Sequence, residues 1–245
     1  MYKKRIVIIT GASRGIGLAT AIKFLDSGCK VYITYKSSPK NHFKKFKVFK
    51  NKNLIPIRCD MTKFNQIKKL KNKIKENYVD VLVNNVGDVL KRSSFMDSTD
   101  ELWKKSIDLN LMSTVRSTLI LSKKLTNSRS AVVVNISSIA GRAGGSGDSL
   151  HYGVAKGAVN VLTSGLAREF RKKKFNIRVI AIAPSIVDTD FQKRHSSKKR
   201  LKTIINQTPI KRIAQPEEIA RLAFWLSLPE SNYISGDTIY VTGGR

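Results

Sequence analysis

The sequence predicts an α/β fold, a doubly wound sheet of about seven parallel strands with helices on both faces. Short apolar runs rich in Val and Ile alternate with longer stretches of helical periodicity along the chain of 245 residues. A glycine-rich turn, Gly11–Gly17, directly follows the first apolar run. Only 15 Gly and 6 Pro interrupt a chain that is 41% hydrophobic, which provides enough apolar material for one large core.

The apolar runs are the expected strands, and their alternation with helices requires right-handed crossovers between parallel neighbours. In chain order they are Arg5–Thr10, Lys30–Tyr35, Leu54–Arg58, Val81–Asn84, Ala131–Ile136, Ile177–Ala183 and Thr238–Val241.

Helical patterns lie between these runs, at Gly15–Ser27, Phe64–Glu76, Thr99–Leu125, Leu150–Arg171 and Pro216–Leu228. Ser98 and Thr99 precede two acidic residues, and Pro216 precedes two glutamates, in agreement with capping and helix-dipole preferences. The segment 185–209 is polar, basic and irregular, and we expect it to form a flap over a site. Since no linker or repeat is found, residues 1–245 are expected to form a single domain.

Composition argues against several other classes of protein. The longest apolar stretches, such as Ile6–Ile9, are far shorter than the roughly 20 residues that cross a bilayer. The basic start, Met1–Arg5, lacks the apolar core of a signal peptide, so we expect a cytoplasmic protein without a membrane partner. Cys29 and Cys59 have no further Cys or His at ligand spacing, so neither a disulfide framework nor a metal site is expected.

The chain carries 46 Lys and Arg against 17 Asp and Glu, a formal net charge of +29. The cations are spread over Lys36–Lys52, Lys63–Lys75, Arg171–Lys174 and Lys193–Lys202, and they are not concentrated in one arm or one recognition helix. That distribution is typical of a solvated basic surface and does not favour specific nucleic-acid binding. Attraction to acidic partners is the alternative interpretation.

The turn from Thr10 to Gly17 has the features of a phosphate-binding loop. Glycines let the backbone turn sharply and approach a pyrophosphate, whose charge is met by amides at the start of the following helix. In dinucleotide-binding folds, an acid about 20 residues further on binds the ribose 2′-hydroxyl of NAD. Here Tyr35-Lys36-Ser37 ends the second expected strand without a carboxylate, and Lys36 with Arg14 suits a 2′-phosphate. The sequence therefore predicts NADP(H). The alternative is that Lys36 belongs to the general basic surface of the protein.

A second group of residues predicts proton transfer. Tyr152 and Lys156 are four residues apart, which places the phenol and the ammonium on one face of a helix. A cation beside a phenol favours the phenolate, and we expect Lys156 to lower the pKa of Tyr152 towards neutrality. Ser137 and Ser138 end the preceding strand, where a hydroxyl could hydrogen-bond a substrate carbonyl.

Taken in order, these motifs resemble those of the short-chain dehydrogenase/reductase family, whose fold is of the Rossmann type. Thr10–Gly17 is similar to the family's TGxxxGxG, Asn84–Gly87 to its NNAG, and Tyr152–Lys156 to its YxxxK. Asn110 matches a helical asparagine of the family, and Pro184–Thr189 resembles PGxxxT. The C-terminal Gly236–Gly244 resembles the segment that returns the last strand to the sheet.

The resemblance implies roles for individual residues. Tyr152 would be the general acid in carbonyl reduction, Ser138 would polarise the substrate oxygen, and Lys156 would hold the nicotinamide ribose. Asn110 would retain a water that links Lys156 to solvent. The implied cofactor-binding residues are Gly11, Ser13, Arg14, Gly15, Ile16, Gly17, Tyr35, Lys36, Ser37, Asp60, Met61, Asn84, Val86, Gly87, Tyr152, Lys156, Pro184, Ile186, Val187 and Thr189.

Some positions depart from the family's pattern. Val86 replaces the alanine of NNAG, and Ser185 replaces the glycine of PGxxxT. The spacing from Ser138 to Tyr152 is one residue longer than in many relatives, so Ser137 remains the alternative catalytic serine. Asp88, Asp148 and His151 are expected near the substrate, where each could discriminate between substrates or serve only as a capped turn or surface group.

The expected function is an NADPH-dependent ketone reductase similar to 3-oxoacyl-(acyl-carrier-protein) reductases, with Arg129, Arg171–Lys174 or Lys193–Lys202 attracting an acidic carrier. A reductase or dehydrogenase for a small sugar, steroid or secondary-metabolite alcohol is the alternative enzyme. A non-catalytic cofactor sensor or nucleic-acid-binding protein is the alternative of another class. The resemblance also implies a homotetramer or homodimer, although Gly153, Ala155, Gly157 and Ala158 could equally pack within one chain.

Overall fold

The structure is a computed structural model that describes residues 5–37 and 50–245. Residues 38–49 of the basic segment Lys36–Lys52, and residues 1–4 of the basic start, lie outside the described residues. No helix in the described part is long and apolar enough to cross a membrane.

A sheet of seven parallel strands forms the centre of the described ranges, in the order β3-β2-β1-β4-β5-β6-β7. The strands are β1 (Ile6–Ile9), β2 (Lys30–Tyr35), β3 (Leu54–Arg58), β4 (Val81–Asn84), β5 (Ala131–Ile136), β6 (Ile177–Pro184) and β7 (Thr238–Val241). The predicted doubly wound fold is therefore confirmed, and each predicted strand is present within one residue at either end.

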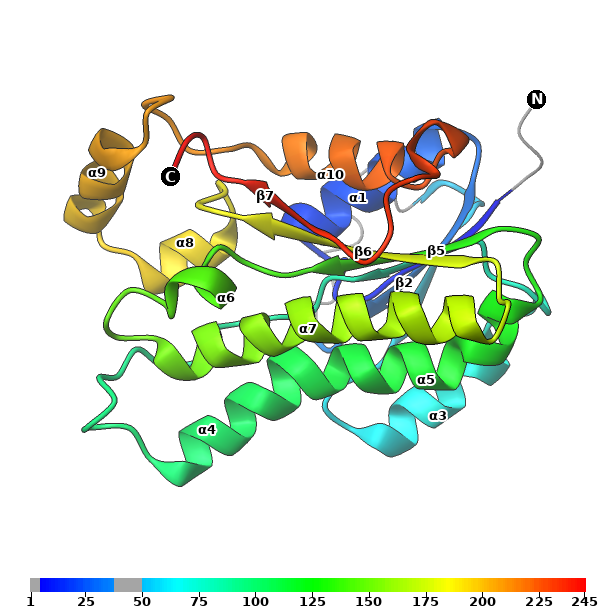
Figure 1. Cartoon of the computed structure of the whole chain (residues 1–245), viewed down its shortest axis with the longest axis horizontal. Coiled ribbons are helices and arrows are strands. Elements are labelled where there is room, and N and C mark those ends of the chain that lie inside the picture. The colour runs from blue at the N-terminus through cyan, green and yellow to red at the C-terminus, as the bar shows by residue number, and fades with distance from the viewer. Residues whose placement is uncertain (1–4, 38–49) are drawn as a thin grey trace.

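Helices cover both faces of this sheet (Figure 1). On one face lie α1 (Gly15–Asp26) and α10 (Pro216–Trp225), and on the other lie α3 (Phe64–Lys73), α4 (Asp100–Ile107), α5 (Ser113–Thr126) and α7 (Leu150–Lys172). A capping box closes the start of α10, where Gln215 and Glu218 exchange side-chain and backbone hydrogen bonds.

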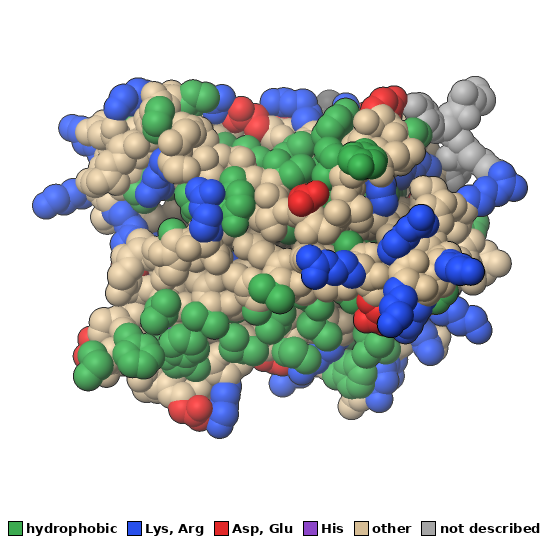
Figure 2. All heavy atoms as spheres, viewed as in Figure 1, with side chains coloured by type: hydrophobic (Ala, Val, Ile, Leu, Met, Phe, Trp, Pro, Cys, Tyr) green, Lys and Arg blue, Asp and Glu red, His purple; other side chains and the backbone are tan. Residues whose placement is uncertain are grey.

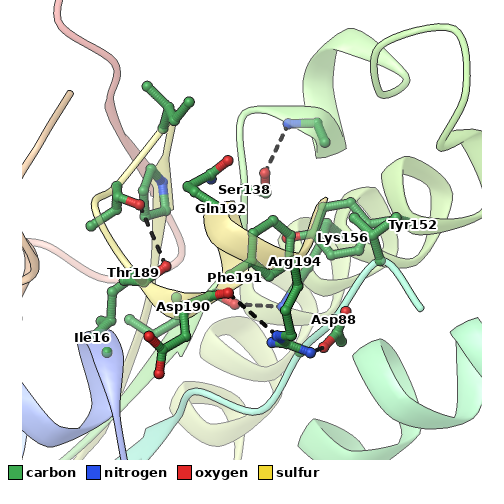
Figure 3. A pocket seen from close by; sticks show the side chains of 18 of the residues that line it. Ile16, Asp88, Ser138, Tyr152, Lys156, Thr189, Asp190, Phe191, Gln192 and Arg194 are labelled. Carbon is green, nitrogen blue, oxygen red and sulfur yellow. Dashed lines mark hydrogen bonds and ion pairs between the residues drawn. The ribbon is translucent and has the colours of Figure 1, made fainter. Parts of the chain in front are cut away.

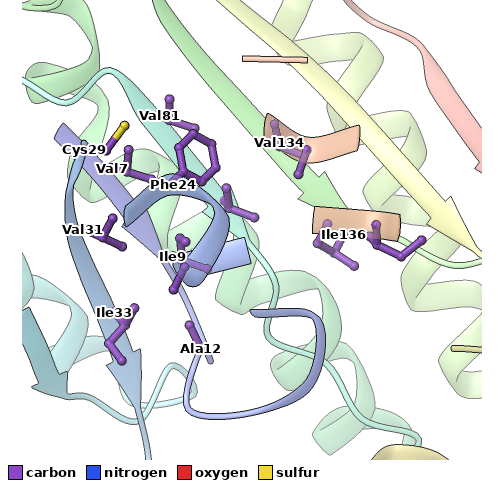
Figure 4. Close-up of a cluster of buried hydrophobic side chains, with 14 of the residues drawn as sticks. Val7, Ile9, Ala12, Phe24, Cys29, Val31, Ile33, Val81, Val134 and Ile136 are labelled. Carbon is purple, nitrogen blue, oxygen red and sulfur yellow. The ribbon is translucent and has the colours of Figure 1, made fainter. Parts of the chain in front are cut away.

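Burial on both faces explains why the strands have continuous apolar sequences. Along β1, Val7 and Ile9 belong to the core beneath α1 and α10, whereas Ile6 and Ile8 belong to the core on the opposite face. Figure 4 shows the first of these cores, in which the ring of Phe24 lies among valines and isoleucines of the strands.

The predicted helix over Thr99–Leu125 is divided by a π-helical turn, η2 (Asp108–Met112), between α4 and α5. A π turn inserts one extra residue and so changes the direction in which the following side chains point. Asn110 lies in this turn and is fully buried. Hydrophobic periodicity does not reveal such an insertion, because the helix continues on both sides of it.

The predicted flap is more regular than expected. Within 185–209 the chain forms α8 (Asp190–His195) and α9 (Lys198–Gln207), and the hydroxyl of Ser197 caps α9 by accepting from the Arg200 N–H. Both helices lie at the end of the sheet towards which the arrowheads of β6 and β7 point (Figure 1). The prediction of irregular structure was wrong here, because short polar helices carry little hydrophobic periodicity.

The small residues of α7 pack closely within the chain, against α6 (Ala140–Ala143) and the loop after it. A Cβ on Gly153 would lie 2.7 Å from the carbonyl carbon of Gly144, and one on Gly157 would lie 2.9 Å from the carbonyl oxygen of Gly141. A Cβ on Gly141 would in turn lie 2.7 Å from the carbonyl carbon of Lys156. These glycines therefore allow α6 and α7 to pack backbone against backbone.

Candidate active site

A cavity of about 970 Å³ opens at the carboxyl ends of the strands. Its walls come from the loops after β1 to β6, from α7 and from the flap helices α8 and α9. The strand order reverses between β1 and β4, and ligands of open α/β sheets bind at such a reversal.

The loop after β1 has the geometry of an anion cradle. Gly11 and Gly15 have positive φ angles of 63° and 55°, which favour glycine, and the N–H of Gly11 donates to Thr34 Oγ1 over 3.1 Å. The N-cap residue of α1, Arg14, provides no side-chain cap, and the first turn contains no acidic residue. The first amides of α1 can therefore meet a phosphate, so the loop fits the diphosphate of a dinucleotide.

The flap adjoins this cradle. A Cβ on Gly15 would lie 3.2 Å from Thr189 Cγ2, so the residue that precedes α8 packs directly against the loop. Figure 3 shows Ile16 and Thr189 on the same side of the cavity. The diphosphate cradle and the flap thus form one continuous wall.

The end of β2 provides a cation at the cavity. Lys36 Nζ lies 3.0 Å from Asp60 Oδ2, and the Lys36 side chain is 70% exposed. Asp60 also accepts hydrogen bonds from the backbone N–H and hydroxyl of Thr62, over 3.0 and 2.8 Å. Burial raises the pKa of Asp60, but the Thr62 hydrogen bonds and the Lys36 ammonium outweigh it and hold that pKa below its usual value. Asp60 is thus a fixed anion that can orient Lys36.

Tyr152 and Ser138 lie together in the wall of the cavity, from α7 and from the end of β5 (Figure 3). Burial raises the pKa of Tyr152 to about 12, although its hydrogen bond with Ser138 opposes the shift. The predicted lowering of this pKa by Lys156 was wrong: Lys156 Nζ lies 5.9 Å from the ring centroid, and desolvation dominates. At neutral pH Tyr152 is therefore a protonated phenol, the form that can donate a proton.

The Lys156 ammonium is buried, with the residue 3% exposed, and Nζ donates to the carbonyl oxygen of Ile136 over 2.8 Å. Desolvation lowers the pKa of Lys156 to about 8. One of its three protons is thus directed at the strand, and the other two remain for partners in the cavity.

The two candidate serines have different surroundings. The hydroxyl of Ser137 is buried and donates to the carbonyl oxygen of Lys156 over 3.1 Å. Ser138 lines the cavity, and its Oγ accepts from the N–H of Ala140 over 3.1 Å. Ser138 thus faces the cavity beside Tyr152, to which it is hydrogen-bonded, whereas the Ser137 hydroxyl is tied to the backbone, so the geometry favours Ser138 over Ser137.

Two carboxylates at the rim bind the flap. Asp88, after β4, lies 2.5 Å from both Arg194 Nη1 and His195 Nε2 of α8. Asp148, before α7, lies 2.7 Å from Arg92 and 3.0 Å from Arg200 of α9. Figure 3 shows Arg194 reaching Asp88 across the cavity. Sequence reasoning placed Asp88 and Asp148 near the substrate but gave no signal for these partners, which are distant along the chain.

Most predicted site residues line the cavity, but Gly17, Asn84 and Asn110 do not. Asn84 departs from its expected place because it ends β4 facing the core, where Nδ2 donates to Asn135 Oδ1 and Thr118 Oγ1. The next residue, Asn85, lines the cavity instead, and its Nδ2 donates to the carbonyl oxygens of Thr10 and Gly11. Successive side chains of a strand point in opposite directions, so this alternation predicts that Asn84 and Asn85 face different surroundings.

Comparison with known proteins agrees with this geometry. The family model described as enoyl-(acyl carrier protein) reductase matches residues 11–245. The chain therefore belongs to the short-chain dehydrogenase/reductases. These are oxidoreductases that use a nicotinamide cofactor, NAD(H) or NADP(H).

Several relatives match almost the whole chain. A 3-oxoacyl-(acyl-carrier-protein) reductase FabG of Thermotoga maritima is 30% identical over 98% of this chain and 97% of its own length. Glucose 1-dehydrogenase 2 of Bacillus subtilis is 31% identical over 100% of this chain and 96% of its own length. The ligand-free aldohexose dehydrogenase of Thermoplasma acidophilum superposes with a TM-score of 0.86 at 27% identity, covering 99% of this chain and 94% of that one.

Proposed function

We propose that the protein is an NADPH-dependent carbonyl reductase that transfers hydride to a ketone, with Tyr152 as the general acid. The observation that carries this proposal is the protonated Tyr152 phenol beside Ser138 in the cavity wall, with a pKa of about 12. A binding protein without catalytic activity has no need for a proton donor at this place, so the non-catalytic alternative is not favoured.

The residues of the chain supply alignment and a proton. Ser138 lines the cavity and offers its hydroxyl proton to the substrate oxygen, while its Oγ accepts from the Ala140 N–H. Tyr152 donates its proton as negative charge develops on that oxygen. Lys156 offers two N–H donors for ribose hydroxyls. The nicotinamide supplies the hydride when it is bound.

The coenzyme is proposed to be NADP(H), held at its 2′-phosphate by Lys36 and Arg14. Replacing Lys36 by Ser removes a charge-assisted hydrogen bond worth about 1.5–3 kcal/mol, so the Kd for NADPH should rise by about 10–150-fold. The Kd for NADH should change little, because NADH lacks this phosphate. Fluorescence titration with both coenzymes measures the effect.

The matched control for this prediction is Lys71→Ser, which removes an exposed lysine of α3 that does not line the cavity. An equal loss of affinity for NADPH and NADH in Lys36→Ser would contradict the proposed 2′-phosphate contact. So would a Kd for NADPH that Lys36→Ser leaves unchanged.

The substrate is proposed to be a 3-oxoacyl group on an acyl-carrier protein, on the strength of the relatives named for that activity. The basic groups expected to attract the carrier differ in position. Arg171–Lys174 end α7, and 20 residues of helix separate Lys172 from Tyr152, a distance of roughly 30 Å at 1.5 Å per residue. Lys199 and Arg200 line the cavity itself, so the mouth formed by α9 is the favoured contact.

A turnover screen of carbonyl compounds with NADPH and NADH in parallel tests the substrate. For a carrier-bound substrate, kcat/KM should exceed that of a simple ketone and fall at least several-fold between about 50 and 300 mM salt, because screening weakens attraction to an acidic carrier. A kcat/KM that does not depend on salt and is highest for an aldose would instead support the sugar alternative. The similarity to glucose and aldohexose dehydrogenases is the observation in its favour.

Self-association as a homotetramer or homodimer is proposed from exposed apolar side chains on and beside α4, α5 and α7. Met96 is 88% exposed, Val161 74% and Leu119 62%. Figure 2 shows apolar side chains gathered over these helices, while basic side chains are scattered over the rest of that face. Sedimentation at micromolar concentration should give a mass above that of the 27.4 kDa monomer.

A cytoplasmic location stays a prediction.

A further inference from the structure

His151 precedes Tyr152 on α7 and points away from the cavity, into the contact between α7, α4 and the loop after β4. The residue is 1% exposed. Its Nε2 lies 3.0 Å from the carbonyl oxygen of Lys91, and its Nδ1 lies 3.0 Å from Ser106 Oγ. The ring of Trp103 packs edge-on against it, with centroids 6.2 Å apart. Both ring nitrogens are therefore engaged.

The partners fix the direction of these hydrogen bonds. The Lys91 carbonyl oxygen can only accept, so Nε2 carries a proton. In the neutral ring Nδ1 is then an acceptor, and the hydroxyl of Ser106 donates to it. The lone pairs of Ser106 Oγ thereby remain available to a donor on the other side.

That donor is the side-chain amide of Asn110. Asn110 Nδ2 lies 3.4 Å from Ser106 Oγ, 3.0 Å from the Ser106 carbonyl oxygen and 2.9 Å from the Asp88 carbonyl oxygen. Asn110 Oδ1 accepts from the Asp88 N–H over 2.9 Å. The –NH₂ group thus faces only acceptors, and the amide has a single satisfied orientation.

The oxygen of this amide lies near the catalytic ammonium. A Cβ on Gly87 would lie 3.0 Å from Asn110 Oδ1 and 2.9 Å from Lys156 Nζ, so both atoms adjoin the space beside Gly87. A reversed amide would present its positive –NH₂ end there instead of the oxygen. The orientation of the Asn110 amide therefore changes the electrostatic environment of the Lys156 ammonium.

We propose that His151 is a positioning residue for carbonyl reduction, whose neutral ring acts through Ser106 to hold the Asn110 amide with its oxygen towards Lys156. This inference rests on the proposed reductase function. It assigns a role to a histidine that does not line the cavity and cannot touch the substrate.

The surroundings of His151 keep it neutral. Burial lowers its pKa, although the hydrogen bond to the Lys91 carbonyl opposes that shift. The charged groups on the elements packed against it have other partners or face solvent: on α4, Lys104 pairs with Asp100 and Lys105 with Glu101. On the loop after β4, Asp88 pairs with Arg194 and His195, and Arg92 pairs with Asp148. Asp97 accepts a hydrogen bond from Ser94, and the Lys91 side chain is exposed.

Protonation of His151 has a defined consequence. As pH falls through its lowered pKa, Nδ1 becomes a donor, and the Ser106 hydroxyl can no longer donate to it. The hydroxyl then turns away and competes with the Asn110 –NH₂ for the remaining acceptors. The kcat for reduction should therefore fall on the acid side of the pH profile.

The test uses the full-length protein with saturating NADPH and two variants of His151. His151→Phe should lower kcat by about 5–20-fold and leave KM and the Kd for NADPH within twofold, because it removes the acceptor for Ser106. His151→Asn keeps an acceptor near the place of Nδ1 and should restore kcat to within about threefold of the wild type, without the acid limb of the profile.

The matched control is a His195→Asn variant. Only the shape of its pH profile of kcat is compared with that of the wild type, and this profile should retain the acid limb. A kcat in His151→Phe equal to that of the wild type would overturn the proposal. An acid limb that persists in His151→Asn and disappears in His195→Asn would also overturn it.

A readout independent of turnover separates this inference from the proposed function. Long-range ¹H–¹⁵N correlation spectra distinguish histidine tautomers, and single His→Asn variants assign the signals of the three histidines. His151 should be the neutral Nε2–H tautomer at pH 7. A protonated ring or the Nδ1–H tautomer would refute the hydrogen-bond direction. Lack of turnover with every carbonyl, together with the expected tautomer, would refute the reductase function instead.

Discussion

Replacing Tyr152 by Phe should reduce kcat for carbonyl reduction by about 10²–10⁴-fold, the range that a positioned general acid provides. The phenol lies in the wall of the cavity, and its pKa of about 12 keeps it a donor throughout the physiological range. The Kd for NADPH should stay within about threefold, because the aromatic ring is kept. Steady-state kinetics and fluorescence titration measure the two effects separately.

The matched control is Tyr78→Phe, which removes a phenol that packs against the core on the α5 and α7 face, outside the cavity. It should leave turnover unchanged. Retention of wild-type kcat by Tyr152→Phe would contradict the role of Tyr152 as proton donor. A parallel loss of NADPH binding would show a structural role for the hydroxyl instead.

Replacing Lys156 by Met should abolish most turnover and raise the stability of the fold. The ammonium is buried, and its pKa falls from 10.5 to about 8, which corresponds to about 3 kcal/mol of unfavourable charge burial at neutral pH. Methionine has a similar volume without the charge, and it forgoes the hydrogen bond to Ile136, so we expect a net gain of about 1–3 kcal/mol. Denaturant unfolding at pH 7 measures this change.

The pH dependence of that gain gives a sharper test. Between pH 8 and 10.5 the unfolded chain binds the Lys156 proton and the folded chain does not, so the stability of the wild type rises with pH in this window. The advantage of Lys156→Met should therefore be largest below pH 8 and shrink towards pH 10. The control, Lys69→Met, removes an exposed lysine of α3 and should show neither effect. A Lys156→Met variant less stable than the wild type at pH 7 would contradict this account.

The sequence was sufficient to predict the sheet and the positions of the main helices, because continuous apolar runs such as Ile6–Ile9 mark strands buried on both faces. It also placed Ser138, Tyr152 and Lys156 together, because their spacing follows the ends of β5 and the start of α7. These features depend on local pattern and on the general geometry of parallel sheets.

Other features depend on contacts between distant residues, which local pattern does not encode. The direction of the Tyr152 pKa shift is an example, because it is set by desolvation in the folded cavity and not by the nearest cation in the sequence. The partners of Asp88 are another, since Arg194 lies 106 residues away. The π turn at Asn110 is a third, because one inserted residue hardly changes the apolar periodicity.

The backbone contact between α6 and α7 has a consequence for how the protein can move. Gly141 contacts the main chain at Lys156, and Gly153 contacts the main chain at Gly144. Because no side chain lies between the two backbones, neither element can slide along the other without a steric clash. Ser138 and Tyr152 are carried on the two sides of this junction and must keep their mutual geometry through every turnover. Adaptation to ligands of different shape then falls to α8 and α9, which are held by ion pairs at the rim of the cavity.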